Sequence, residues 1–199
     1  MQPMIALVVV FLLAVGFTGS LNAEDNPNAK FVGVSKCGSS GCHGNAKLGN
    51  QMAKWEDSGH GKATTDLDTK KAKEYAAKLK IADPTKADLC MSCHVTAHGV
   101  PEERLMETFT GDQGVECEMC HGAGSLYLEP HKKKDRNSAD LIAKGLRSLK
   151  TEKEIKENCM QCHGATEKWE KIKASGHSKL DKTPFEEGLK KTKHPLPKS

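Results

Sequence analysis

The segment Gly114-Val115-Glu116-Cys117-Glu118-Met119-Cys120-His121 contains two cysteines that are separated by two residues and followed at once by histidine. The same arrangement recurs at Cys90-Met-Ser-Cys93-His94 and at Cys159-Met-Gln-Cys162-His163. A fourth copy, Cys37-Gly-Ser-Ser-Gly-Cys42-His43, has four residues between its cysteines. Together the four copies use all eight cysteines of the chain, which indicates one chemical function repeated four times.

Two thiols at this spacing can bond the two vinyl groups on one edge of a porphyrin, and the following imidazole then lies beneath the iron. We therefore predict four covalently attached haem c groups. The longer loop of the first motif contains only small residues, which can fold out of the way. The predicted attachment residues are Cys37, Cys42, Cys90, Cys93, Cys117, Cys120, Cys159 and Cys162, and the predicted proximal iron ligands are His43, His94, His121 and His163.

Three other uses of paired cysteines fit the pattern less well. Structural zinc sites contain Cys-x-x-Cys pairs, but zinc does not require a histidine directly after each pair. Disulfides within such short loops would remove little entropy from the unfolded chain. A thioredoxin-like redox site needs one such motif rather than four.

Composition also limits the fold. The 199 residues are 37% hydrophobic, 28% charged and only 5% aromatic, and the net charge is +4. Ordinary domains are about 45–50% apolar, so a conventional core would be thin here and four porphyrins would supply buried surface. Segments 68–79 and 139–157 are rich in Ala, Lys and Glu and predict helices. We expect a mainly α fold with long loops, organised around four covalent haems.

The N-terminal segment 1–23 has no charged residue and includes an apolar run from Ile5 to Phe17. Those thirteen residues would span about 20 Å as a helix, less than the roughly 30 Å of a bilayer core, so they predict a signal peptide. Segment 24–199 would then be one tetrahaem cytochrome c domain in the periplasm or another extracytoplasmic compartment. Membrane contact is expected only if the signal stays uncleaved, and the tail 190–199 is expected to fray or to form a contact arm.

Five histidines remain for the far side of the irons: His60, His98, His131, His177 and His194. His60 and His177 each follow an attachment motif, a tryptophan and a Ser-Gly pair, so the two segments look like an internal repeat. His98 lies four residues after His94, on the same helix face, and could serve only a different iron. The candidate distal ligands are therefore His60, His98, His131 and His177, with His194 as a weaker alternative.

The order of these motifs and the Gly-Val-x-Cys-Glu-x-Cys-His-Gly stretch that ends at Gly122 resemble the cytochrome c-554 type of tetrahaem cytochrome. The likeness covers most of the chain after the signal. It implies that His131 binds the iron of His43 and that His60 binds the iron of His121.

The resemblance has two further implications for iron ligation. The iron of His163 would take its distal ligand from the C-terminal part, as His177 or His194. In the type member of the family the second haem is five-coordinate, and its counterpart here is the haem of His94.

These features predict an electron carrier that relays single electrons between extracytoplasmic redox partner proteins, rather than an enzyme. The alternative is a haem enzyme that reduces nitric oxide, nitrite or hydroxylamine at a five-coordinate haem on His94. The many lysines are expected to pair with haem propionates, so nucleic acid is not a predicted partner. A spare histidine would also permit an oligomer in which subunits exchange distal ligands.

Overall fold

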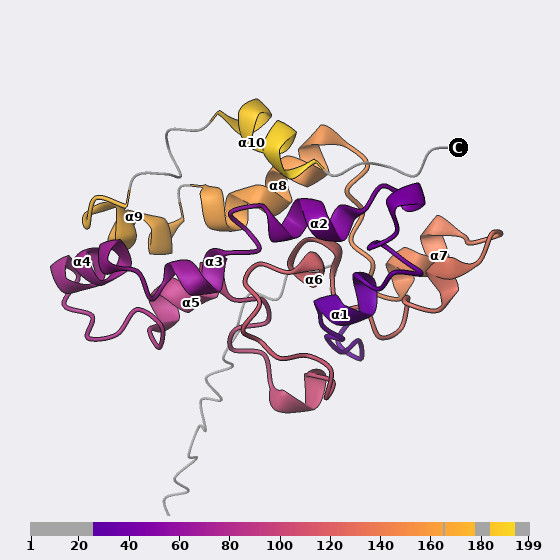
Figure 1. Cartoon of the computed structure of the whole chain (residues 1–199), viewed down its shortest axis with the longest axis horizontal. Coiled ribbons are helices and arrows are strands. Elements are labelled where there is room, and N and C mark those ends of the chain that lie inside the picture. The colour runs from indigo at the N-terminus through magenta and orange to yellow at the C-terminus, as the bar shows by residue number, and fades with distance from the viewer. Residues whose placement is uncertain (1–25, 165, 178–183, 194–199) are drawn as a thin grey trace, which may run out of the picture.

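The computed structural model describes residues 26–164, 166–177 and 184–193, and it is mainly helical with long connecting loops (Figure 1). Within these ranges the β structure is limited to one isolated bridge between Phe31 and Leu105. The predicted fold class is therefore confirmed. The predicted signal peptide and the end of the predicted tail lie outside the described residues. No described helix is long and apolar enough to cross a membrane.

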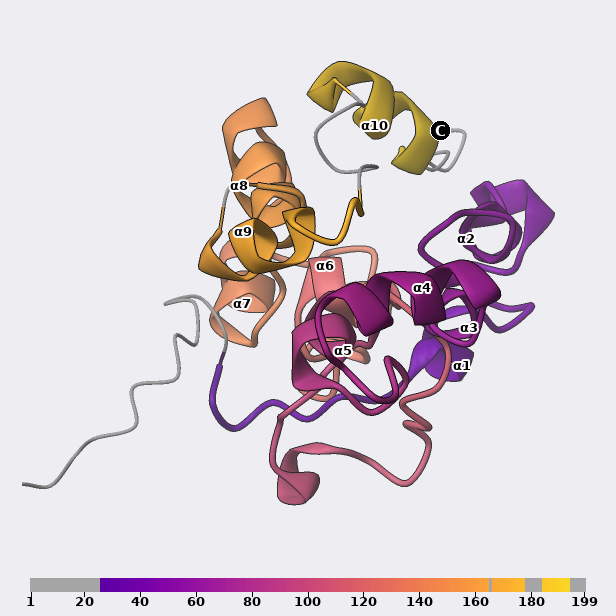
Figure 2. The ribbon, with the colours of Figure 1, turned by 90° about the vertical axis from the view of Figure 1, so that its left-hand side faces the viewer.

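The helices are short, and most are separated by irregular loops. They are α1 (Val34–Cys37), α2 (Gln51–Glu56), α3 (Ala63–Asp66), α4 (Lys70–Lys78), α5 (Asp88–His94), α6 (Cys117–His121), α7 (Ser138–Ala143), α8 (Glu152–His163), α9 (Glu167–Lys173) and α10 (Phe185–Thr192). Three short 3-10 helices lie between them: η1 (Ala46–Leu48), η2 (Glu102–Arg104) and η3 (Pro130–Lys132). Figure 1 shows α7 near one end of the molecule and α4 and α9 near the other, and Figure 2 views the molecule from the α4 end.

Local sequence explains where several helices begin. The Thr69 hydroxyl accepts from the amide of Ala72 and begins α4, which falls within the predicted helical segment 68–79. At α8, Thr151 and Glu154 form a reciprocal capping box. The second predicted helix, 139–157, is wrong as a single element, because the chain leaves the helix after Ala143 and resumes at Glu152.

Gly145 is the physical reason for that break. Its φ of +100° lies in the left-handed region that only glycine adopts readily. The neighbouring Arg147 amide donates to the carbonyl of His121 at 3.0 Å, so this stretch crosses to α6 instead of continuing a helix.

The described aliphatic core is small, as the composition predicts. Ala29, Phe31 and Ala123 are buried together and contact four partly buried residues, Ala97, Val100, Leu105 and Phe109. The N-terminal segment reaches this core because the Phe31 amide and carbonyl both bond to the loop around η2, at Arg104 and Met106. Backbone hydrogen bonds thus join the N-terminal segment to this loop.

Candidate haem-binding sites

Three of the four attachment motifs lie at the C-terminal ends of helices. The helices α5, α6 and α8 end at His94, His121 and His163 respectively. One helical turn therefore places two cysteines and the histidine of each motif close together. This arrangement is what attachment of one porphyrin edge above one imidazole requires.

The first motif brings its cysteines and its histidine close together without a regular helical turn. Its extra residues form a turn in which the Cys42 amide donates to Ser39 O at 2.9 Å. The His43 amide then donates to Cys37 O at 3.1 Å. In a shorter motif, an ordinary i to i−4 helical bond would join the corresponding residues. The small residues of this loop form the turn that brings Cys37 and His43 together.

Thiols from different motifs lie together, although none of the eight cysteines forms a disulfide. The thiols of Cys37 and Cys117 are close enough to interact, and this interaction raises the pKa of Cys37 and lowers that of Cys117. A similar contact with Cys162 lowers the pKa of Cys93 to about 6. These contacts join the first motif to the third and the second motif to the fourth.

A third connection links the third motif to the fourth. Burial raises the pKa of Cys120, and the neighbouring Cys159 adds to that rise. Arg147 donates to Met119 O in α6 at 2.6 Å and to Asn158 Oδ1 in α8 at 3.3 Å. The four attachment sites therefore adjoin in the spatial order first, third, fourth, second.

Three proximal histidines each face a second histidine from a distant part of the chain. The ring centres of His43 and His131 are 6.2 Å apart, with ring planes inclined by 7°. Those of His94 and His177 are also 6.2 Å apart, inclined by 79°. Those of His60 and His163 are 5.9 Å apart, inclined by 54°.

These separations fit an iron atom between the two rings. A metal–imidazole bond is about 2 Å long, and each ring adds about 1 Å from its nitrogen to its centre, which gives a span of about 6 Å. Face-to-face stacking would bring rings closer together than this, so the nearly parallel rings of His43 and His131 fit an intervening atom best. Within the described residues, no group of three or more His, Cys, Asp or Glu side chains forms a metal site, so the geometry is one of imidazole pairs.

Hydrogen bonds to Nδ1 orient several of these rings. His94 Nδ1 lies 2.7 Å from Ala63 O, and His131 Nδ1 lies 2.6 Å from Leu128 O. His43 Nδ1 lies 3.2 Å from Gln51 Oε1. A carbonyl beside Nδ1 keeps the proton on that nitrogen and leaves the lone pair of Nε2 for a metal. Burial also lowers the pKa of His60, which favours its neutral, metal-binding form.

The facing rings differ from the implied pairing at two positions. His131 faces His43, as the resemblance implied. His60, however, faces His163 rather than His121, and His177 faces His94 rather than His163. The His60 carbonyl accepts from the Val115 amide at 2.9 Å, so His60 is held beside the chain that enters α6.

His98 also differs from the predicted ligand set. Its Nε2 lies 3.0 Å from Asp88 Oδ1, at the start of α5. The nitrogen that would bind iron is therefore engaged by a carboxylate, and His98 is not placed opposite a proximal histidine. The alternative ligand His194 lies outside the described residues.

Two buried glutamates beside the third motif are functional residues that the sequence analysis missed. Glu118 accepts from the amides of Val32, Gly33 and Gly124, at 2.7–3.0 Å. Glu116 accepts from the Val34 amide at 2.7 Å. Both side chains thus fasten the segment before α1 to α6, which brings the first and third attachment sites together. In the sequence, only the position of these two glutamates on either side of Cys117 could have drawn attention to them.

The segment before α6 also positions a distal ligand. The indole N–H of Trp55 donates to Val115 O at 2.7 Å, and the Val115 amide donates to His60 O. Gly114 has a φ of +82°, and a side chain there would collide with the His60 carbonyl. The tryptophan and glycine of the sequence pattern therefore act together to hold His60.

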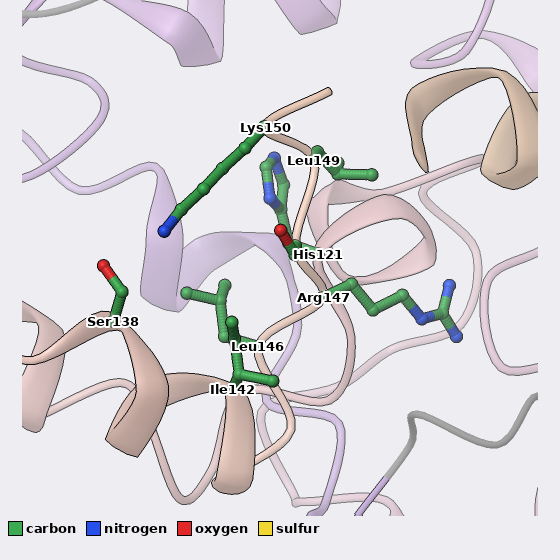
Figure 3. A pocket seen from close by; sticks show the side chains of 8 residues that line it. His121, Ser138, Ile142, Leu146, Arg147, Leu149 and Lys150 are labelled. Atoms are coloured by element: carbon green, nitrogen blue, oxygen red, sulfur yellow. The ribbon is translucent and has the colours of Figure 1, made fainter. Parts of the chain in front are cut away.

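A cavity of about 220 Å³ adjoins His121. Its wall is formed by α7 and the chain that follows it, including the apolar side chains of Ile142, Leu146 and Leu149. Figure 3 shows the His121 ring beside Leu149 and Lys150. An apolar wall beside a proximal histidine is suited to cover part of a porphyrin attached through Cys117 and Cys120.

The chain is similar to known proteins. Residues 36–122 match the family described as cytochrome c554 and c-prime. The chain is 30% identical to cytochrome c-554 of Nitrosomonas europaea over 178 residues, which cover 82% of this chain and 69% of the relative. A solved structure of the reduced state of cytochrome c554 from Nitrosomonas europaea shows 32% identity and a TM-score of 0.49, covering 70% of this chain and 67% of the other.

Proposed function

The chain belongs to the family of cytochrome c554 and c-prime, and on that premise we propose that it is an exported tetrahaem cytochrome that relays single electrons between redox partner proteins. Membership of this cytochrome c family implies covalently bound haem c and supports electron transport. We further propose that the chain binds four haems, that it is exported and that it exchanges electrons with partner proteins.

The continuous line of attachment sites is the observation that carries this proposal. Cys37 adjoins Cys117, Cys120 adjoins Cys159, and Cys162 adjoins Cys93. Electron tunnelling weakens steeply with distance, so groups attached at adjoining thiols can exchange electrons without a moving carrier. The protein then contributes spacing and orientation.

Each haem supplies reversible one-electron chemistry between ferric and ferrous iron when it is bound. The chain's own residues hold these groups by eight cysteines and by imidazole pairs such as His43 with His131. Imidazole on both faces of iron favours low reduction potentials and leaves no position for a substrate. Fixed ligands also keep the geometry similar in both oxidation states, which suits rapid electron transfer.

The enzyme alternative requires an open iron on His94. His177 opposes it, because its ring centre lies 6.2 Å from that of His94, at the span expected for two ligands of one metal. Export is supported by the uncharged apolar segment 1–23, and residues 24–199 would then form one haem domain outside the cytoplasm.

A redox titration of the purified holoprotein, combined with a turnover assay, tests this function. We expect four one-electron equivalents per chain and no steady-state consumption of nitrite, nitric oxide or hydroxylamine by the reduced protein. Sustained turnover of any of these compounds, faster than free haem supports, would favour the enzyme and refute the relay. A total of fewer than four electrons would refute the tetrahaem assignment.

A further inference from the structure

We propose that His177 is the sixth ligand of the iron held by His94, and that Tyr75 and Lys78 on α4 are positioning residues that keep it there. This inference rests on the proposed haem attachment at Cys90 and Cys93. It assigns to this chain a closed second iron, whereas the resemblance implied an open one.

The two imidazoles are oriented as opposed ligands. The His94 ring is fixed through its Nδ1, which lies 2.7 Å from Ala63 O at the start of α3. That bond keeps Nε2 of His94 available to a metal, and the His177 ring centre lies 6.2 Å from that of His94. The two rings are nearly perpendicular, at 79°, an orientation that two axial ligands can adopt without touching each other.

Aromatic side chains enclose His177 on other sides. The ring centre of Tyr75 lies 5.3 Å away, and that of the buried Trp169 lies 6.1 Å away in an edge-on arrangement. Tyr75 comes from α4 and Trp169 from α9, so side chains from both helices contact His177. Figure 1 shows these two helices at the same end of the molecule. Such contacts restrict the orientation of the ring.

Lys78 fastens the chain just before His177. Its Nζ donates to Ser175 O at 3.1 Å and lies 5.9 Å from the centre of the Tyr75 ring. Ser175 is itself buried, and its hydroxyl donates to Ile172 O at 2.7 Å. The turn that leads to His177 is thus held both to α4 and to the end of α9.

The test uses carbon monoxide binding to the dithionite-reduced holoprotein and electron paramagnetic resonance of the ferric form. We expect His177→Ala to gain one CO-binding haem per chain, a quarter of the total haem, relative to the wild type. Nearly perpendicular ligand planes leave two iron d orbitals close in energy, so the His94 iron should give a strongly anisotropic low-spin signal. That signal should disappear in His177→Ala and be replaced by a high-spin signal.

His98→Ala is the matched control, because His98 lies four residues from His94 but bonds to Asp88. It should gain no CO-binding haem and keep the anisotropic signal. Unchanged CO binding in His177→Ala, or an equal gain in His98→Ala, would overturn the assignment. In Tyr75→Leu and Lys78→Ala, CO should bind this haem at least several-fold faster than in the wild type, at unchanged haem content. Unchanged rates would overturn the role of α4.

A second substitution covers the case in which His177→Ala loses haem. His177→Met keeps a ligand and should raise the potential of one haem, because a thioether ligand stabilises ferrous iron relative to imidazole. If His177→Met keeps four haems and none of their reduction potentials changes, this inference is contradicted and the proposed function is not. Fewer than four haems in the wild type would contradict the proposed function instead.

Discussion

Glu116 and Glu118 show how two identical residues in one motif acquire different properties. Both are buried, at 2% and 1% exposure. Glu118 accepts hydrogen bonds from three backbone amides. Oε1 of Glu116, by contrast, has no hydrogen-bond partner among the described residues. Burial raises the pKa of Glu116 to about 7, and the nearby carboxylates of Glu118 and Asp112 add to the rise.

The raised pKa of Glu116 predicts a pH-dependent stability. The folded state binds this proton more tightly than an unfolded chain with a pKa near 4.5, so the contribution of Glu116 to stability is lost as the pH rises from that value through about 7. Glu116→Gln should flatten this part of the profile and be the more stable protein at pH 8. Denaturant unfolding of both holoproteins between pH 5 and 8 measures the difference. Parallel profiles would contradict the prediction.

The same substitution at Glu118 should have the opposite effect. Both oxygens of Glu118 accept from backbone N–H groups, so an amide nitrogen in Glu118→Gln would face donors. We expect a loss of about 1–3 kcal/mol at every pH. Equilibrium unfolding at pH 5 and pH 8 provides the check, and a variant as stable as the wild type would show that these bonds do not hold α1 to α6.

At the level of elements, α8 depends on its N-terminal cap. The Glu154 amide donates to Thr151 Oγ1 at 3.2 Å, and the Thr151 amide donates to Glu154 Oε2 at 2.8 Å. Thr151→Ala should cost about 1 kcal/mol of stability. Lys153→Ala is a suitable control on the same helix, since its exposed pair with Glu157 spans 3.8 Å and should contribute little. Similar unfolding midpoints for the two variants would contradict the role of the cap.

Local pattern was sufficient for some elements and insufficient for others. The composition of segment 68–79 predicted α4, and the Thr69 cap in the structure agrees with it. The segment 139–157 was predicted as one helix because its composition is equally favourable. The break is made at Gly145, whose left-handed conformation composition does not predict. The chain beyond it is held by a bond between Arg147 and His121, which are 26 positions apart and are brought together only by the fold.

The same distinction applies to the candidate sites of the whole molecule. Attachment cysteines and proximal histidines follow from spacing alone, because each set lies within a few residues. The facing imidazole pairs cannot be predicted from spacing. His60 and His163 belong to distant segments, and so do His94 and His177. The glutamates beside Cys117 were missed for a related reason: their partners are backbone amides of residues 32–34, and amides have no sequence signature.

The molecule as a whole has little apolar interior without its cofactors. The buried apolar cluster is formed by Ala29, Phe31 and Ala123, while buried carboxylates and backbone bonds connect the remaining segments. Covalent haems would lie among α5, α6 and α8 and supply the missing hydrophobic surface. Stability and electron relay would then depend on the same four groups.

The most direct test of this account is the intact mass of the purified holoprotein under denaturing conditions, together with its haem content by alkaline pyridine spectroscopy. Covalent attachment at every motif predicts one species that carries the mass of four haems and retains them after acidic extraction. A chain that carries fewer than four haems, or haem that leaves on denaturation, would contradict the central claim that all four cysteine pairs hold haem.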